Sequence, residues 1–229
     1  MPFGYYYDPT MLILVPAVIL SLIAQYLVNS AYSKYSRVGI MNGYTGAEVA
    51  RRMLDEAGLY NVPIEIVNRR LGDHYDPRSR VLRLSPDVYN DRTISSACIA
   101  AHEVGHAIQH SQSYAPLQIR NSVVNVVNFA SSASWIIFLA GLVMSAKPLL
   151  TLGILLFSVA VFFQLITLPV EFNASSRALK ILKSRGYLME SEISGAKRVL
   201  SAAALTYVAA AIMSILQLLR LIALSNRRD

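Results

Sequence analysis

Four long runs of uncharged, mostly apolar residues dominate this chain of 229 residues. The first, over 11–32, has no charged side chain in 22 residues, which is enough to cross a hydrocarbon core of about 30 Å as a helix. Two more runs, at about 123–144 and 149–169, are separated by a short segment with a charge and a proline, which predicts a hairpin. The fourth run, over 199–224, is interrupted only by Arg220, which can reach the headgroups. We therefore predict an α-helical integral membrane protein with four transmembrane helices.

The polar residues fall into two blocks between these runs, and both blocks must lie on one side of the membrane if all four runs cross it. The predicted division is an N-terminal segment with the first span (1–32), a membrane-proximal region (33–122), a transmembrane hairpin (123–169), a connector with a helix (171–198), and a fourth span with a tail (199–229). The start of the chain has no Lys or Arg, so it lacks the basic region of a signal peptide, and we expect the first span to be retained.

Basic residues near the ends of the runs favour a cytoplasmic location of both blocks, because Lys and Arg are enriched in short cytoplasmic segments. These residues are Lys34, Arg37, Arg120, Arg177, Lys180, Lys183, Lys197 and Arg198. Arg227 and Arg228 at the end of the chain favour the opposite orientation. The balance predicts a multi-pass protein of the inner or plasma membrane, with both polar blocks in the cytoplasm.

The net charge of +7 is better explained by this topology and by attraction to anionic lipid than by nucleic-acid binding. No nucleic-acid-binding module is visible, so we expect the lipid bilayer as a partner and no nucleic acid. The single cysteine, Cys98, cannot form an intramolecular disulfide and fits a reducing compartment. The sequence leaves the oligomeric state open.

The motif with the most chemical content is His102-Glu103-Val104-Gly105-His106, in a stretch with helical character. On an α-helix the two histidines lie one turn apart, so both imidazoles can reach one tetrahedral metal ion. Glu103 projects to one side, where it can reach a metal-bound water and act as a general base. Asp91 or Thr93 can cap the start of this helix. The alternative is a helix whose histidine pair is merely buried.

Around this motif the sequence predicts a small α+β region. Thr45 and Glu48 form a capping box before an amphipathic helix that Gly58 ends, and 62–67 is expected to be a short strand. A turn precedes a second strand at 81–85, which we expect at the edge of the sheet. Helix, small sheet and metal helix is the order of a zincin-like catalytic region. An edge strand beside the metal would let an extended peptide pair with it.

A catalytic zinc needs a third protein ligand, and four residues are candidates. His110 lies too far round the helix to join the pair, and Cys98 is better explained as a small buried thiol. His74 lies in a loop, from which it could contact substrate or an oxyanion, although a solvated loop histidine is as reasonable. Glu171 follows a proline and is expected to begin a helix that runs to about Ser184 on the same side of the membrane. Its alternative role is to stabilise that helix start.

Three segments carry a resemblance to a known family. The segments 102–109, 73–78 and 167–175 resemble the bacterial membrane-bound neutral zinc metallopeptidases of the YugP type, and the similarity runs from the first span to the last. More distantly, a metal helix followed by a membrane hairpin and a Glu-x-x-Ala helix is similar to the integral-membrane gluzincins, the CAAX-processing and heat-shock membrane proteases. This resemblance implies that Glu171 is the third zinc ligand.

The chain departs from those relatives just after Glu171. The distant relatives place an acidic residue where this chain has Ser175, and Asn173 stands where an acid is expected in the closer family. Such an acid orients a zinc histidine. Here Asn173, Ser175 or Ser176 holds the histidine, or the role is vacant.

The sequence therefore predicts a membrane-embedded zinc endopeptidase, with Zn²⁺ held by His102, His106 and Glu171 and with Glu103 as the catalytic base. Its expected substrates are membrane or membrane-proximal proteins or peptides. The alternative is a catalytically silent membrane scaffold or adaptor with a structural zinc site, although such a site has no use for Glu103. A small transporter is disfavoured because no run carries an ionisable residue at mid-membrane.

Overall fold

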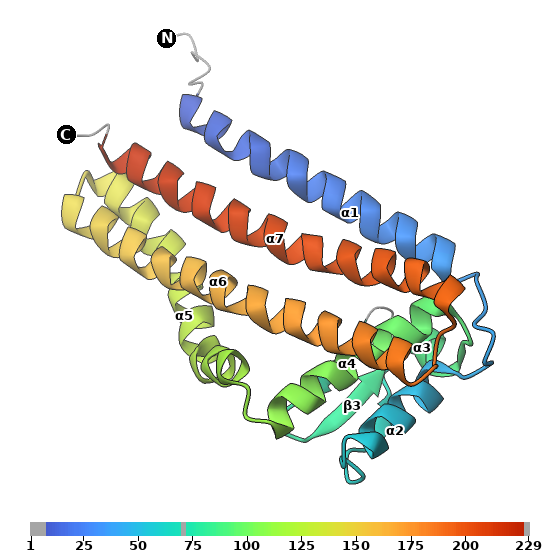
Figure 1. Cartoon of the computed structure of the whole chain (residues 1–229). Helices are drawn as coiled ribbons and strands as arrows, with labels where there is room; N and C mark the ends of the chain where they lie inside the picture. The colour runs from blue at the N-terminus through green and yellow to red at the C-terminus, as the bar shows by residue number, and fades with distance from the viewer. Residues whose placement is uncertain (1–7, 70–71, 227–229) are drawn as a thin grey trace.

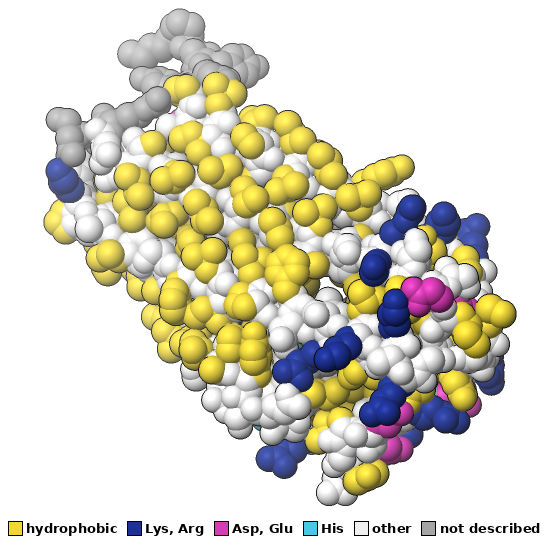
Figure 2. Space-filling view, in the orientation of Figure 1, with side chains coloured by type: hydrophobic (Ala, Val, Ile, Leu, Met, Phe, Trp, Pro, Cys, Tyr) yellow, Lys and Arg dark blue, Asp and Glu magenta, His cyan; other side chains and the backbone are white. Residues whose placement is uncertain are grey.

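Four long helices form the body of the protein (Figure 1). The computed structural model describes residues 8–69 and 72–226, so Arg227 and Arg228, which bear on orientation, lie outside the described residues. The helices are α1 (Val15–Tyr35, preceded by the 3-10 helix η1, Pro9–Leu14), α5 (Ala115–Met144), α6 (Lys147–Ser184) and α7 (Glu190–Asn226). All four are long and apolar enough to cross a membrane, as predicted. Figure 2 shows hydrophobic side chains over the visible face of this body, while most of the visible Lys and Arg side chains gather at the compact end of the molecule.

A tight turn joins α5 to α6 where the sequence predicted a break. Ser145 takes the left-handed conformation, with φ of 52°, and ends α5. Two glycines then let the antiparallel helices approach closely: a Cβ at Gly153 would lie 2.8 Å from the Cβ of Phe138, and one at Gly141 would lie 2.8 Å from the backbone nitrogen of Leu150. The hairpin is therefore tightly packed at its closed end.

Helix α6 is continuous through Pro169, so the prediction that Glu171 begins a new helix is wrong. Its 38 residues correspond to about 57 Å. A proline inside a helix removes one backbone hydrogen bond, but packing against neighbouring helices can compensate, and α6 packs against both α5 and α7. Glu171 is consequently held in the middle of a rigid element rather than at a frayed helix end.

An ion pair near the other end of the bundle involves the charge that interrupts the fourth run. Arg220 Nη2 lies 2.9 Å from Asp8 Oδ2, and Arg220 Nε lies 3.3 Å from Thr10 Oγ1. Arg220 was expected to reach the headgroups; in the structure it joins the start of η1 to α7.

The compact end contains three shorter helices and a three-stranded sheet. These are α2 (Gly46–Glu56), β1 (Ile64–Ile66), β2 (His74–Asp76), β3 (Val81–Leu84), α3 (Pro86–Asn90) and α4 (Ile94–Ser111). The capping box of Thr45 and Glu48 is present at the start of α2, as predicted. Of the two candidate caps for α4, Thr93 caps it through a reciprocal pair of hydrogen bonds with Ser96.

The sheet has the order β1-β3-β2, so β3 is the central strand and its predicted edge position is wrong. β1 pairs with β3 in parallel, and β2 pairs with β3 in antiparallel fashion. Val81, Leu82 and Leu84 of β3 are buried, as expected for a strand with neighbours on both sides. The edge strand that faces the metal helix is instead β2, through which Tyr75 reaches α4.

The compact end shares its hydrophobic core with two of the long helices. Val49 and Leu54 of α2 and Leu82 of β3 are buried in the same cluster as Leu182 of α6 and Ile193 of α7. The ends of α6 and α7 thus complete the core around α4. This shared core fixes α6 against α4 and determines which residues of α6 face the histidines.

Candidate metal centre

Helix α4 carries its two histidines on the face turned toward α6. The imidazole rings of His102 and His106 have centroids 4.8 Å apart. Gly105 between them packs against α6, where an added Cβ would lie 2.8 Å from the backbone oxygen of Ala174. Glycine at this position lets α4 and α6 approach closely. The approach is close enough for a side chain of α6 to reach the histidines.

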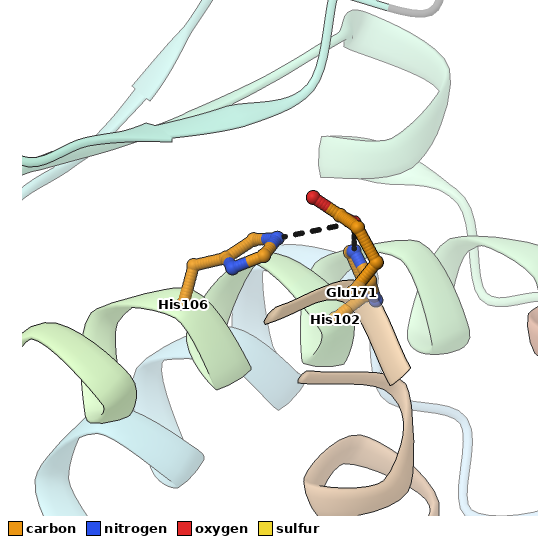
Figure 3. Close-up of side chains that lie close together, drawn as sticks. All are labelled: His102, His106 and Glu171. Carbon is orange, nitrogen blue, oxygen red and sulfur yellow. Dashed lines mark hydrogen bonds and ion pairs between the residues drawn. The ribbon is translucent and has the colours of Figure 1, made fainter. Parts of the chain in front are cut away.

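Glu171 is the side chain that does so (Figure 3). Its Oε2 lies 3.2 Å from His102 Nε2 and 3.6 Å from His106 Nε2, and its side chain is only 3% exposed. One potential ligand atom from each of the three residues lies within 4.8 Å of the others. Two imidazole nitrogens and one carboxylate oxygen are the donor set that suits catalytic zinc and leaves a fourth position open. The three predicted metal ligands are therefore brought together, from two helices far apart in the sequence.

A chain of side chains orients His106. The Nε2 of Gln109 donates to Val170 O at 2.8 Å and to Asn173 Oδ1 at 3.0 Å, so its Oε1 must face the Nδ1 of His106, 3.0 Å away. Arg177 Nε donates to the same Asn173 Oδ1 at 2.7 Å and fixes that amide in turn. An amide oxygen can only accept, so Nδ1 of His106 carries the proton and Nε2 is free to bind a metal.

His102 has a simpler partner. Its Nδ1 lies 3.1 Å from Ser175 Oγ, which again leaves Nε2 toward the centre. Of the alternatives left open by the sequence, Ser175 contacts a histidine directly, and Asn173 acts through Gln109. Ser176 lines a separate hollow between α6 and α7. Sequence reasoning missed Gln109, although it lies three residues after His106 and hence on the same helix face.

Glu103 lies beside the cluster without joining it. Its Oε2 accepts a hydrogen bond of 3.1 Å from the backbone N–H of Tyr75 in the edge strand β2. Burial raises the pKa of the Glu103 carboxyl, although the neighbouring histidines act in the opposite direction. A partly buried carboxylate held next to a potential metal position is the arrangement required of a general base.

The cluster opens into a cleft of about 220 Å³. Its lining includes His74 and Tyr75 of β2, Arg120 of α5 and Tyr207 of α7. Arg120 Nη1 lies 3.3 Å from the outer oxygen of Glu171. Sequence reasoning considered Arg120 only as a juxtamembrane charge, and Tyr207 gave no signal because it lies in an apolar run.

The remaining candidate ligands have other environments. His110 Nδ1 lies 2.9 Å from the hydroxyl of Tyr75 and is not part of the metal cluster. Cys98 is fully buried in the core, and burial raises the pKa of its thiol. His74 lies in the cleft, with its Nδ1 2.7 Å from Gly72 O.

The comparisons with known proteins identify the family of this chain. Residues 10–226 match the family described as "Putative neutral zinc metallopeptidase", and the chain belongs to that family. It is thus a hydrolase of the zinc metallopeptidase class with four helices able to span a membrane. A relative named "Putative membrane protease YugP", from Bacillus subtilis (strain 168), is 55% identical over 211 residues, which cover 92% of this chain and 94% of that protein. The resemblance found in the motifs is confirmed. No solved structure matches this chain, so the zincin-like architecture stays a prediction.

Proposed function

We propose that this protein is a zinc endopeptidase whose metal is held by His102, His106 and Glu171 and whose general base is Glu103. The observation that carries the proposal is the convergence of three ligand atoms beside a partly buried carboxylate that is itself not one of the three. A purely structural zinc site would have no use for Glu103 in that position.

Each residue of the centre has a chemical task. When bound, zinc supplies a Lewis acid that makes water more acidic and polarises the scissile carbonyl. Glu103 is placed to accept a proton from the attacking water and to pass it to the departing amine. The N–H of Tyr75 holds the Glu103 carboxylate toward the cleft. Gln109 and Ser175 keep the two imidazoles in the tautomer that ligates through Nε2.

The edge strand offers a place for the peptide. Among the described residues, β2 pairs only with β3, and the N–H of Tyr75 donates to Glu103. An extended substrate pairing with β2 would lie across the cleft, with its backbone close to Glu103. Arg120 and Tyr207 also line this cleft and can donate hydrogen bonds to substrate oxygens.

The surroundings of the centre support membrane or membrane-proximal substrates. Phe172, next to Glu171, is 48% exposed, and Ile119, next to Arg120, is 46% exposed. The centre therefore lies at the border of the apolar surface, with basic residues such as Lys180 and Lys197 beyond it. Because basic residues at such borders mark the cytoplasmic side, we place the centre on the cytoplasmic face of the inner or plasma membrane.

The test separates metal binding from hydrolysis. Glu103→Gln should keep about one zinc per chain and lose at least about 100-fold in peptide hydrolysis, because only the proton carrier is removed. Glu171→Ala should lose zinc, whereas His110→Ala, on the same helix as the histidines, should keep it. Metal analysis of the purified variants beside a peptide-cleavage assay measures both. Full hydrolysis by Glu103→Gln would contradict the base, and metal loss only in His110→Ala would contradict the ligand set.

A further inference from the structure

A second hollow lies between α1 and α7, which run side by side (Figure 1). Its volume is about 440 Å³, and every residue that lines it belongs to one of these two helices. We call it the α1–α7 hollow. The chain runs toward the compact end along α1 and away from it along α7, so the last turns of α1 lie beside the first turns of α7.

The α1–α7 hollow has a basic end and an apolar end. Lys34 and Arg198 line it near the compact end, and both side chains are exposed. Leu27 and Leu205 line it seven residues further from the compact end on their helices, which corresponds to about 10 Å. Because both helices are able to span a membrane, the apolar end lies toward the hydrocarbon and the basic end toward the headgroups.

The two basic side chains have no acidic partner. Among the residues that the structure describes, no ion pair involves Lys34 or Arg198, and no Asp or Glu lines the hollow. By contrast, Arg220 is paired with a carboxylate near the other end of α7. Lys34 makes one contact of another kind, with its Nζ 5.4 Å from the centre of the Tyr35 ring. Two like charges that line one hollow repel each other, so an anion between them is favourable.

The lining also defines the chemistry of the anion. The hydroxyl groups of Ser30, Tyr35 and Ser201 line the hollow and can donate hydrogen bonds to phosphate oxygens. A free phosphate would leave the apolar end empty, and an acidic peptide would have to place polar backbone there. An anionic phospholipid has both a negative headgroup and an acyl chain, and basic pockets between membrane helices suit such headgroups.

We propose that the α1–α7 hollow binds one anionic phospholipid, with its phosphate between Lys34 and Arg198 and an acyl chain against Leu27 and Leu205. The inference does not depend on the peptidase function. The lipid would join α1 to α7 beside a contact that already connects them, since a Cβ at Gly195 would lie 2.7 Å from Cε1 of Tyr35. Tyr35 belongs to the core of the compact end, so the bound lipid is expected to stabilise the attachment of α1 to the rest of the protein.

Native mass spectrometry of the full chain in a non-ionic detergent tests the site by counting bound lipids. The wild type should bind one phosphatidylglycerol in preference to phosphatidylcholine, whose choline cation the two basic residues repel. A basic residue near a membrane surface contributes about fivefold to the binding of anionic lipid, so Lys34→Gln/Arg198→Gln should weaken binding of the first phosphatidylglycerol by about tenfold or more.

A matched control removes the same charge elsewhere. Lys180→Gln/Lys197→Gln changes two exposed basic residues of α6 and α7 that do not line the hollow, and it should leave this affinity nearly unchanged. Equal weakening in both double variants would show general attraction of anions and would overturn the inference. Equal affinity of the wild type for the two lipids would overturn it as well.

A second pair of variants tests the position of the lipid without altering charge. Ser30→Phe should obstruct the hollow and lower the affinity for phosphatidylglycerol by about tenfold, a loss comparable to that from removing the basic pair. Ser33→Phe, at an exposed position of α1 that does not line the hollow, should not. Wild-type affinity in Ser30→Phe would contradict the assignment.

Thermal unfolding distinguishes the lipid from its headgroup. Phosphatidylglycerol should raise the unfolding temperature of the wild type, whereas phosphatidylcholine or inorganic phosphate alone should not. Without lipid, Lys34→Gln/Arg198→Gln should unfold at the wild-type temperature or higher, because two unpaired like charges are removed, and added phosphatidylglycerol should then have little effect. An equal rise with inorganic phosphate, or an undiminished rise in this double variant, would refute a phospholipid site in the α1–α7 hollow.

Discussion

Gln109 provides a sharp test of how the metal centre is oriented. It is fully buried, and its amide joins His106 of α4 to Val170 and Asn173 of α6. In Gln109→Leu the side chain at position 109 keeps nearly the same shape, but the Nδ1–H of His106 loses its hydrogen-bond acceptor. Loss of such a partner typically lowers metal affinity 10- to 100-fold, which corresponds to about 1.4–2.7 kcal/mol. A buried N–H left without a partner also lowers the free energy of unfolding by about 1–3 kcal/mol.

Two further variants separate orientation from packing. Gln109→Glu keeps an acceptor for His106 but loses the donor to Val170 and Asn173, so zinc affinity should stay near the wild-type value while stability falls. Gln112→Leu is the control: it repeats the Gln-to-Leu change about one turn later, at an exposed position that contacts Arg177. It should alter neither the zinc affinity nor the stability strongly. Zinc affinity is measured by competition with a chelator, and stability by thermal unfolding of the metal-free protein. Wild-type zinc affinity in Gln109→Leu would refute the orienting role.

Two other predictions follow from the same helices. Gly105→Ala should lower zinc affinity at least about tenfold, because the added Cβ would press on the backbone of Ala174. The same clash should lower the free energy of unfolding by about 1–3 kcal/mol, from which a gain of about 1 kcal/mol in helix propensity is subtracted. Chelator competition measures the zinc affinity, and thermal unfolding measures the stability. For sidedness, single cysteines at Ser184 and Ser145 in a Cys98→Ala background should react differently with an impermeant maleimide in intact cells, with only position 145 labelled from outside. The opposite labelling would place the centre on the outer face.

The features predicted well from sequence depend on local spacing. Four uncharged runs predict four long helices, and the i, i+4 spacing of His102 and His106 predicts two ligands on one helix face. Glu171 was a candidate from its place in the sequence, but its assignment as the third ligand came from family resemblance, because nothing in its local sequence shows that α6 packs against α4. That contact depends on Gly105 and Ala174, which are 69 residues apart.

The wrong predictions depend on non-local packing. Pro169 suggested a helix start for Glu171, but α5 and α7 support α6 through that point. The alternation in β3 suggested an edge strand. Its central position could not be predicted, because the parallel pairing with β1 joins segments that no hairpin connects. Gln109 was overlooked because its partners, Val170 and Asn173, lie in another helix.

The separation of the ligands along the chain has a consequence for biogenesis. His106 and Glu171 are 65 residues apart, and α5, the turn and much of α6 lie between them. At about 5–20 residues per second, a ribosome adds His106 roughly 3–13 s before it adds Glu171. In the folded protein, α6 runs antiparallel to α5, and this return of the chain brings Glu171 back to α4. With the proposed ligands, a nascent chain that ends before Glu171 carries only two of the three, so the proposed metal site is complete only once α6 packs against α4.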